Sequence, residues 1–196
     1  VKGSDFTSTR VTGGSSTGVD FAQAADGTGH VFNRDNMPLT FGTNNLERMR
    51  IDATGAVTMP LQPAFLVTPA SLQLDLNTDD TIAFGTEIFD QNADFASNTF
   101  TAPVTGRYQL NYTLRIDNLD TASAWSRTVI VTSNRNYEST ILDLGGFSAD
   151  PVYYHYGAST LVDMDAGDTA FLKWQQSGGA AQADVNYGQF SGYLVA

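Results

Sequence analysis

Alternation of apolar and polar residues is the strongest pattern in the second two thirds of the chain. From Gly106 to Ile116, every second residue beginning at Tyr108 is apolar. A period of two predicts a β-strand with one buried face. Turn-forming residues recur about every ten positions, which favours a β-sandwich or jelly roll. The other predicted strands after position 62 are Ala64 to Val67, Ile82 to Phe84, Thr99 to Thr101, Ser126 to Thr132, Val152 to Ala158, Ser159 to Met164, Thr169 to Gln175 and Gly188 to Val195.

The first sixty residues carry shorter strand-like runs, each with only one to three apolar side chains. A segment so short and apolar-poor is hard to stabilise as an isolated monomeric domain. We therefore expect a β stalk in which several copies of the chain interdigitate. The Gly-, Ser- and Thr-rich stretch before these runs (residues 3–18) is too polar to order itself. The runs are Val19 to Gln23, His30 to Asn33, Leu39 to Gly42, Leu46 to Asp52 and Ala56 to Met59.

A boundary between the two regions is predicted in the sequence MPLQP, where Pro60 and Pro63 stop any strand. Residues 1–62 form the polar lead and the stalk, and residues 63–196 form one β-sandwich head. The head is long enough to bury about two-thirds of the surface its unfolded chain exposes, so it can hold an independent core.

Composition supports an all-β fold and excludes several functions. The 21 acidic residues comprise 18 Asp and 3 Glu, and the 10 basic residues comprise 8 Arg and 2 Lys, which leaves little material for surface helices. A net charge of −11 argues against nucleic acid as a partner. No apolar run approaches 18 residues, so no membrane insertion is expected. The absence of cysteine excludes disulfides and thiolate chemistry. The chain begins at Val1 without a leader, which suggests a fragment of a longer protein.

Pro38 to Met59 contains a short strand, Thr-Asn-Asn, an Arg-Met-Arg-Ile-Asp strand and a Gly turn. This unit resembles one that is common in the shafts of bacteriophage tail fibres and related virion appendages. The resemblance implies that the predicted stalk (about residues 18–60) is a trimeric β shaft.

Four motifs after the boundary occur in one order: Ala64-Phe65, Phe100 to Tyr108 (FTAPVTGRY), Ala166 to Leu172 (AGDTAFL) and Phe190 to Leu194 (FSGYL). Together they resemble the globular head of complement component 1q and its tumour-necrosis-factor-like relatives. The resemblance covers about residues 63–196 and implies a ten-stranded jelly roll that assembles as a homotrimer.

The same resemblance implies positions for the subunit contacts. In the closing strand, Phe190 is expected near the threefold axis, with Tyr108 or Leu110 on the neighbouring strand. We therefore predict these three residues at the trimer interface.

Catalysis is not expected from this sequence. Only His30 and His155 could act as histidine bases, and no Gly-x-Ser-x-Gly elbow is present. A carboxylate pair for glycoside hydrolysis is an alternative, tested by replacing Glu87 and Glu138.

Calcium is the one cofactor considered, and no other is expected. Asp163 and Asp165 should point outward from an alternating strand while Val162 and Met164 point inward. A trimer would bring three copies of this pair close together, which suits a divalent cation. The favoured interpretation is nevertheless that the two carboxylates are solvated charges.

Exposed aromatic residues are the candidates for ligand binding. Tyr153 and Tyr154 are adjacent on a predicted strand, so at least one must face away from the core. Trp125 lies in a predicted loop, where an aromatic ring suits stacking on a sugar. Trp125 and Tyr154 are therefore the predicted ligand-binding residues.

The leading hypothesis is a virion protein in which a trimeric shaft carries a head that binds a host cell surface. The ligand would be a cell-surface glycan or an outer-membrane component, including a protein, and the shaft would attach to other fibre or baseplate proteins. One alternative is a secreted, non-viral adhesin or ligand with the same head. Another is the carbohydrate-binding module of an enzyme. Heads of one fold recognise different partners through their loops, so this step rests on the resemblance.

Overall fold

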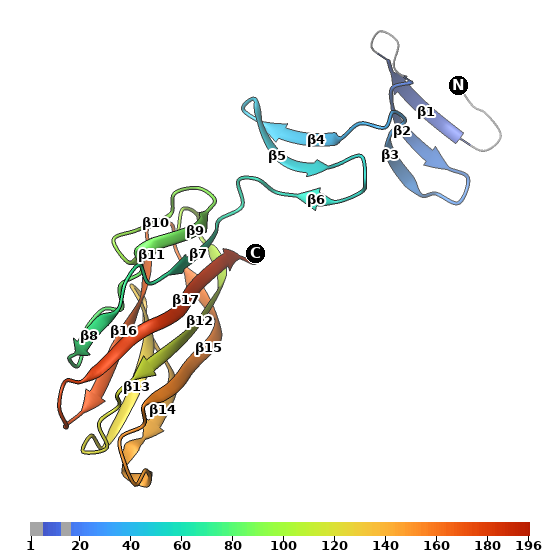
Figure 1. Ribbon diagram of the computed structural model, residues 1–196. Helices are drawn as coiled ribbons and strands as arrows, with labels where there is room; N and C mark the ends of the chain where they lie inside the picture. Colours follow the sequence, from blue (N-terminus) through green and yellow to red (C-terminus); the bar gives the residue numbers. More distant parts are fainter. Residues whose placement is uncertain (1–5, 13–16) are drawn as a thin grey trace. The chain divides into compact units, whose positions relative to one another are not determined.

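A computed structural model of the protein describes residues 6–12 and 17–196 (Figure 1). Among these residues, the regular elements are β-strands apart from one 3₁₀ turn at Leu144–Gly146, which confirms the predicted all-β class. The chain divides into two compact units, Val1–Leu61 and Gln62–Ala196. Over the described part of the chain, no helix has the length and apolarity needed to cross a membrane.

The described residues of unit 1 form two small antiparallel sheets. The first joins β1 (Phe6–Val11), β2 (Val19–Ala24) and β3 (Gly29–Asn33). The second joins β4 (Leu39–Thr43), β5 (Leu46–Ile51) and β6 (Val57–Thr58).

Strand β1 corrects part of the sequence analysis, because it lies in the stretch predicted not to order. It pairs with β2 along its whole length, from Phe6 opposite Ala24 to Val11 opposite Val19. Pairing with a neighbouring strand satisfies its backbone groups despite the polar side chains. Residues 1–5 and 13–16 of the same region lie outside the described residues.

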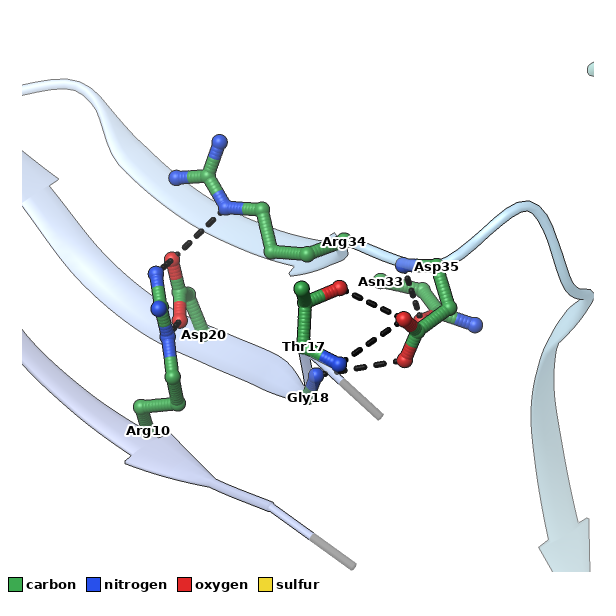
Figure 2. Close-up of polar contacts among 7 residues, drawn as sticks. All are labelled: Arg10, Thr17, Gly18, Asp20, Asn33, Arg34 and Asp35. Atoms are coloured by element: carbon green, nitrogen blue, oxygen red, sulfur yellow. Dashed lines mark hydrogen bonds and ion pairs between the residues drawn. The ribbon is translucent and has the colours of Figure 1, made fainter. Parts of the chain in front are cut away.

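A cluster of charged residues fastens the first sheet (Figure 2). Asp20 on β2 is 3% exposed. Its carboxylate accepts bonds from Arg10 Nε at 2.5 Å and from Arg34 Nε at 2.8 Å. Asp35 accepts bonds from the backbone N–H groups of Thr17 and Gly18, at 2.8 and 3.2 Å. The two carboxylates therefore link the start of β2 to β1 and to the segment after β3.

Acid should loosen this sheet before it affects the head. Hydrogen bonds from Arg10 and then Arg34 hold the pKa of Asp20 well below its usual range. A lowered pKa stabilises the fold above the unfolded value of about 4, and that stability is lost as pH falls from there towards the folded value. The protection factors of residues 6–35, measured as hydrogen exchange relative to an unstructured chain at the same pH, should therefore fall between pH 5 and about pH 3.

Asp20→Asn supplies the control for the acid experiment, since it removes the titrating group. It should exchange faster at pH 7 and change less on acidification. Both tryptophans, Trp125 and Trp174, lie in unit 2, so their fluorescence follows the head separately. Unchanged protection of residues 6–35 at pH 3 would show that the Asp20 cluster contributes little.

Unit 2 is a β-sandwich of two antiparallel sheets. One has the order β10-β11-β16-β13-β14, and the other has the order β15-β12-β17-β7-β9 with β8 paired to β17. The strands are β7 (Ala64–Thr68), β8 (Gln73–Leu76), β9 (Thr86–Asp90), β10 (Phe95–Ala96), β11 (Thr99–Thr101), β12 (Gly106–Asp117), β13 (Trp125–Thr132), β14 (Asn136–Asp143), β15 (Tyr153–Met164), β16 (Thr169–Ser177) and β17 (Ala183–Leu194).

The strand list differs from the prediction in three ways. Unit 2 has eleven strands instead of ten, and β15 is continuous where two strands were predicted. Strands β8, β9, β10 and β14 were not predicted, because β10 has only two residues and the others are rich in polar residues. Strand β14 ends the five-stranded sheet and β9 ends the other, and β8 makes only a short pairing with β17. Ile82–Phe84 was predicted as a strand, and only isolated bridging is found beside it, at Thr81.

The core lies between the two sheets, and the alternation along β12 is confirmed. All five apolar residues predicted on its inward face are buried: Tyr108, Leu110, Tyr112, Leu114 and Ile116. Hydroxyl groups also join the sheets, since Tyr156 on β15 bonds to Ser126 on β13 at 2.6 Å. Burial raises the pKa of Tyr156 to about 12.

The structure places the predicted interface residues Phe190, Tyr108 and Leu110 in the core of a single chain. All three are 0% exposed. Phe190 packs against Phe65 with their ring centroids 5.1 Å apart. Their side chains therefore offer no surface to a second subunit, and the prediction is corrected. The motif was located properly on β17, but its aromatic residue points into the sandwich.

Gly192 explains why the closing motif contains a glycine. A Cβ built at this position would lie 2.6 Å from Leu110 Cδ2 and 2.8 Å from Phe65 Cε1. Neither core side chain has room to move away in a close-packed interior. The motif therefore reflects packing between β17, β12 and β7.

Candidate functional site

The two ends of the sandwich have different roles in the chain. At one end the chain enters and leaves, since Leu194 N donates to Pro63 O at 3.0 Å and Arg107 N donates to Ala196 O at 2.8 Å. At the other end lie the β12–β13, β14–β15 and β16–β17 connections, residues 118–124, 144–152 and 178–182. We call this second end the apical end. Its loops are free of the chain termini and are therefore the natural place for recognition.

Carboxylates hold the apical loops together. Asp184 at the start of β17 is 7% exposed and accepts bonds from Asp75 N at 2.9 Å and Asn118 Nδ2 at 2.8 Å. Asp150 accepts bonds from the hydroxyl of Thr121 at 2.6 Å and from Gln182 Nε2 at 3.1 Å. Asp75 and Asn118 have positive φ values of 55° and 57°, and Asn and Asp tolerate this conformation best among non-glycine residues.

A recess of about 380 Å³ lies between these loops, and no aromatic side chain lines it. Hydrogen bonds from Thr121 hold the pKa of Asp150 below its usual range, so this carboxylate is charged at neutral pH. Carboxylate and amide oxygens accept hydrogen bonds from hydroxyl groups. The recess therefore suits a polyhydroxylated or cationic ligand. Its lining residues are Asp75, Asn118, Asp150, Pro151, Val152, Gln182 and Asp184.

Two exposed tyrosines and an arginine lie close to the recess. The Arg115 guanidinium is 4.8 Å from the ring centroid of Tyr153 and 4.4 Å from that of Tyr187. Asp117 holds it in place through bonds of 2.7 and 2.8 Å. Tyr153 is 62% exposed and Tyr187 is 61% exposed. In the strand register Asp117 lies opposite both Tyr153 and Asp184. Because Asp184 lines the recess, the group of Arg115, Tyr153 and Tyr187 lies beside it.

The predicted ligand-binding residues have different surroundings. Trp125 begins β13 and is half-buried, with the Arg127 guanidinium 4.8 Å from its ring. Tyr154 is half-buried and packs against Tyr156 with a centroid distance of 5.4 Å. The expectation that one of the two adjacent tyrosines faces outward is confirmed, and the exposed one is Tyr153.

Sequence reasoning did not identify Arg115 and Tyr187 as candidates. What brings these two residues together is the pairing of β12 with β17, in which Arg115 lies opposite Tyr187. Pairing of strands distant in sequence cannot be read from the alternation of either strand alone.

The predicted calcium residues lie at the end where the chain enters. Asp163 and Asp165 are exposed and line a recess of about 270 Å³, while Val162 and Met164 are buried as expected. The Asp163 carboxylate is ion-paired with Arg135 Nη2 at 2.9 Å, and Asp165 accepts a bond from the Thr105 hydroxyl at 3.3 Å. A guanidinium at this distance opposes a cation.

Metal-ligating side chains do not gather elsewhere in the residues described. Within 6–12 and 17–196, no group of three or more His, Cys, Asp or Glu side chains could hold a metal ion. The apical carboxylates Asp150 and Asp184 already accept hydrogen bonds from protein donors. Within one chain, the carboxylates named here are therefore held by protein donors.

The outward face of the six-stranded sheet is another extended surface. Leu161 on β15 and Tyr193 on β17 both lie opposite Gln109 on β12, and they are 52% and 49% exposed. Unit 2 carries 15 acidic residues, but β12, β15 and β17 hold only Asp117, Asp163 and Asp184, all near strand ends. The middle of this face is therefore free of acidic residues, which is typical of the centre of a subunit interface.

Comparison with known proteins identifies this class of β-sandwich. The model of the C1q domain family matches residues 64–195, which is more than half of the chain. The chain belongs to the C1q domain family, and the resemblance inferred from the four motifs is confirmed. Domains of this family are generally non-enzymatic and usually form homotrimers.

A solved structure shows the same fold. The globular domain of zebrafish complement 1qA protein has a TM-score of 0.52 and 19% identity, over 69% of this chain and 98% of that one. Murine APRIL at pH 5.0 has a TM-score of 0.46 and 10% identity, over 68% of this chain and 99% of its own. A search of curated proteins gave no match.

Proposed function

We propose that this chain is the homotrimeric tip of a virion fibre, in which the C1q-like head binds a host cell surface and residues 1–62 form the shaft. The observation that carries the proposal is the combination of a complete head with a unit that has no core of its own. Of the residues of unit 1 whose burial is described, 10–12 and 17–61, only Gly18 and Asp20 are buried. Such a unit fits a shaft shared by several chains.

The virion assignment is supported by the sequence of the second sheet of unit 1. Strands β4 to β6 span Leu39–Thr58 and so coincide with the segment that resembles bacteriophage fibre shafts. Other fibre or baseplate proteins are the proposed partners of the shaft. A secreted adhesin or ligand with the same head is the alternative, as is a carbohydrate-binding module of an enzyme.

The head trimer is proposed to form through the outward face of the six-stranded sheet. Leu161 and Tyr193 supply exposed apolar area on this face, and acidic residues are absent from its middle. This arrangement matters because residues 61–196 carry a net charge of −10. A contact through any acidic loop surface would be opposed by repulsion between the subunits.

The apical recess is the proposed contact with the host ligand, a glycan or an outer-membrane component. Sugar hydroxyl groups would donate to Asp75, Asp150 and the amide oxygens, and Tyr153 and Tyr187 would offer ring faces at the rim. The apical end also lies opposite the end where the chain enters the head.

Screening the full chain on a glycan array tests this proposal. We expect binding to a restricted set of glycans, and Asp75→Asn should weaken it by at least tenfold. Asn tolerates the left-handed conformation of position 75 and replaces the charged carboxylate by a neutral amide. Glu138→Gln is the matched control, because Glu138 is an exposed carboxylate outside the recess. Equal binding by both variants would show that the glycan binds outside the recess.

A further inference from the structure

In both sheets of unit 1, most apolar side chains lie on one face and the ion-paired side chains lie on the other. In β1–β2–β3, Phe21 lies opposite Val31, and Val19 lies opposite Val11. Residues opposite each other in an antiparallel pair share a face, so these four side chains point to the same side. In β4–β5–β6, the same rule collects the apolar residues Leu39, Phe41, Met49, Ile51 and Val57.

The opposite faces carry charged side chains that pair within the chain. The first sheet also has Phe32 on this face, opposite Asp20, with the Arg34 guanidinium 5.0 Å from its ring centroid and the His30 ring stacked on it at 4.9 Å. Asp20 is bonded to Arg10 and Arg34 on the first sheet (Figure 2). On the second sheet Arg50 lies opposite Thr40 and Thr58, and it forms a bidentate pair with Glu47 at 2.7 and 2.6 Å. The ion pairs on these faces therefore form without a second chain.

The apolar faces are not covered within the chain. Val11 is 63% exposed, Phe21 54%, Phe41 42% and Val57 57%. None of the apolar residues named above is buried. Three-stranded sheets need an apolar face packed on something to be stable in water. Because both sheets of unit 1 expose apolar side chains, whatever buries these side chains must be present whenever the unit is folded.

We propose that the apolar face of each sheet packs against the same face of that sheet in two other copies of this chain. The three copies of each sheet then enclose a water-free axis, and their ion-paired faces point to solvent. This inference rests on the proposed trimer, because the heads bring three copies of unit 1 together at high effective concentration. Electrostatic repulsion between copies does not oppose this contact, because residues 1–61 carry 5 basic and 6 acidic residues and the ion pairs on the opposite faces form within the chain.

A lack of cysteine makes the inference directly testable by cross-linking. Phe21→Cys and Phe41→Cys place a thiol on the inward faces of the full chain. Three thiols around one axis form a single disulfide, so oxidation should link up to two of every three chains. A three-armed maleimide should instead give covalent trimers.

Ala22→Cys and Thr40→Cys are the matched controls, because each is the neighbouring residue on the opposite, outward face. We expect at least tenfold less cross-linking in these variants at the same protein concentration. Light scattering of each oxidised sample separates the proposed axis in unit 1 from the proposed head trimer. A trimer in which inward and outward thiols link equally, or not at all, overturns the proposed axis and leaves the head trimer standing. A monomer overturns the trimer itself.

Discussion

Leu161→Glu should convert the full chain from a trimer into monomers of 21.1 kDa without unfolding the head. Leu161 is 52% exposed in the single chain, so a charged side chain is tolerated there by the isolated fold. In the proposed trimer it lies in the apolar contact, where an unpaired carboxylate costs several kcal/mol for each subunit. Light scattering at micromolar concentration measures the mass, and tryptophan fluorescence reports whether the head stays folded.

Ile141→Glu is the control for that experiment. Ile141 is 58% exposed, lies on β14 of the other sheet, and carries a side chain of the same size. This variant should remain trimeric. A Leu161→Glu chain that stays trimeric would show that the outward face of the six-stranded sheet does not hold the trimer together, and that another head surface or the faces of unit 1 do.

The sequence predicted those parts of the fold that depend on local periodicity. The inward face of β12 was identified residue by residue, because a period of two assigns alternate side chains to opposite faces. Strand β14 was missed because it ends the five-stranded sheet and its residues, NYESTILD, are mostly polar. Edge strands gain their order from one neighbour, and that neighbour is not visible in their own sequence.

The candidate site was predicted less well, for a related reason. Asp163 and Asp165 were the acids considered from the sequence, whereas Asp184 and Asp150, which were not singled out, cap backbone and side-chain groups from loops distant in sequence. The Arg115, Tyr153 and Tyr187 group joins three strands. Such groupings depend on the strand order of the sheet, which alternation and composition do not specify.

Motif resemblance also has a limit, which Phe190 illustrates. The resemblance correctly placed the closing strand, but the direction of one side chain on it depends on register. In this chain Phe190 lies opposite Val67 and Tyr112, both of them buried, so it belongs to the inward face. Tyr193, three residues later, lies on the outward face.

Phe190→Ala should consequently destabilise the head itself, whereas Tyr193→Glu should separate folded subunits. Removing a fully buried phenylalanine costs about 3–5 kcal/mol, and single domains are stable by only about 5–15 kcal/mol. Urea unfolding followed by tryptophan fluorescence should show a large drop in the midpoint for Phe190→Ala at every protein concentration. Tyr193→Glu should instead abolish the concentration dependence expected of a trimer, because its monomer keeps an intact core. If Phe190→Ala gave folded monomers with the stability of the Tyr193→Glu monomer, Phe190 would act at the subunit contact and its place in the core of the single chain would be wrong.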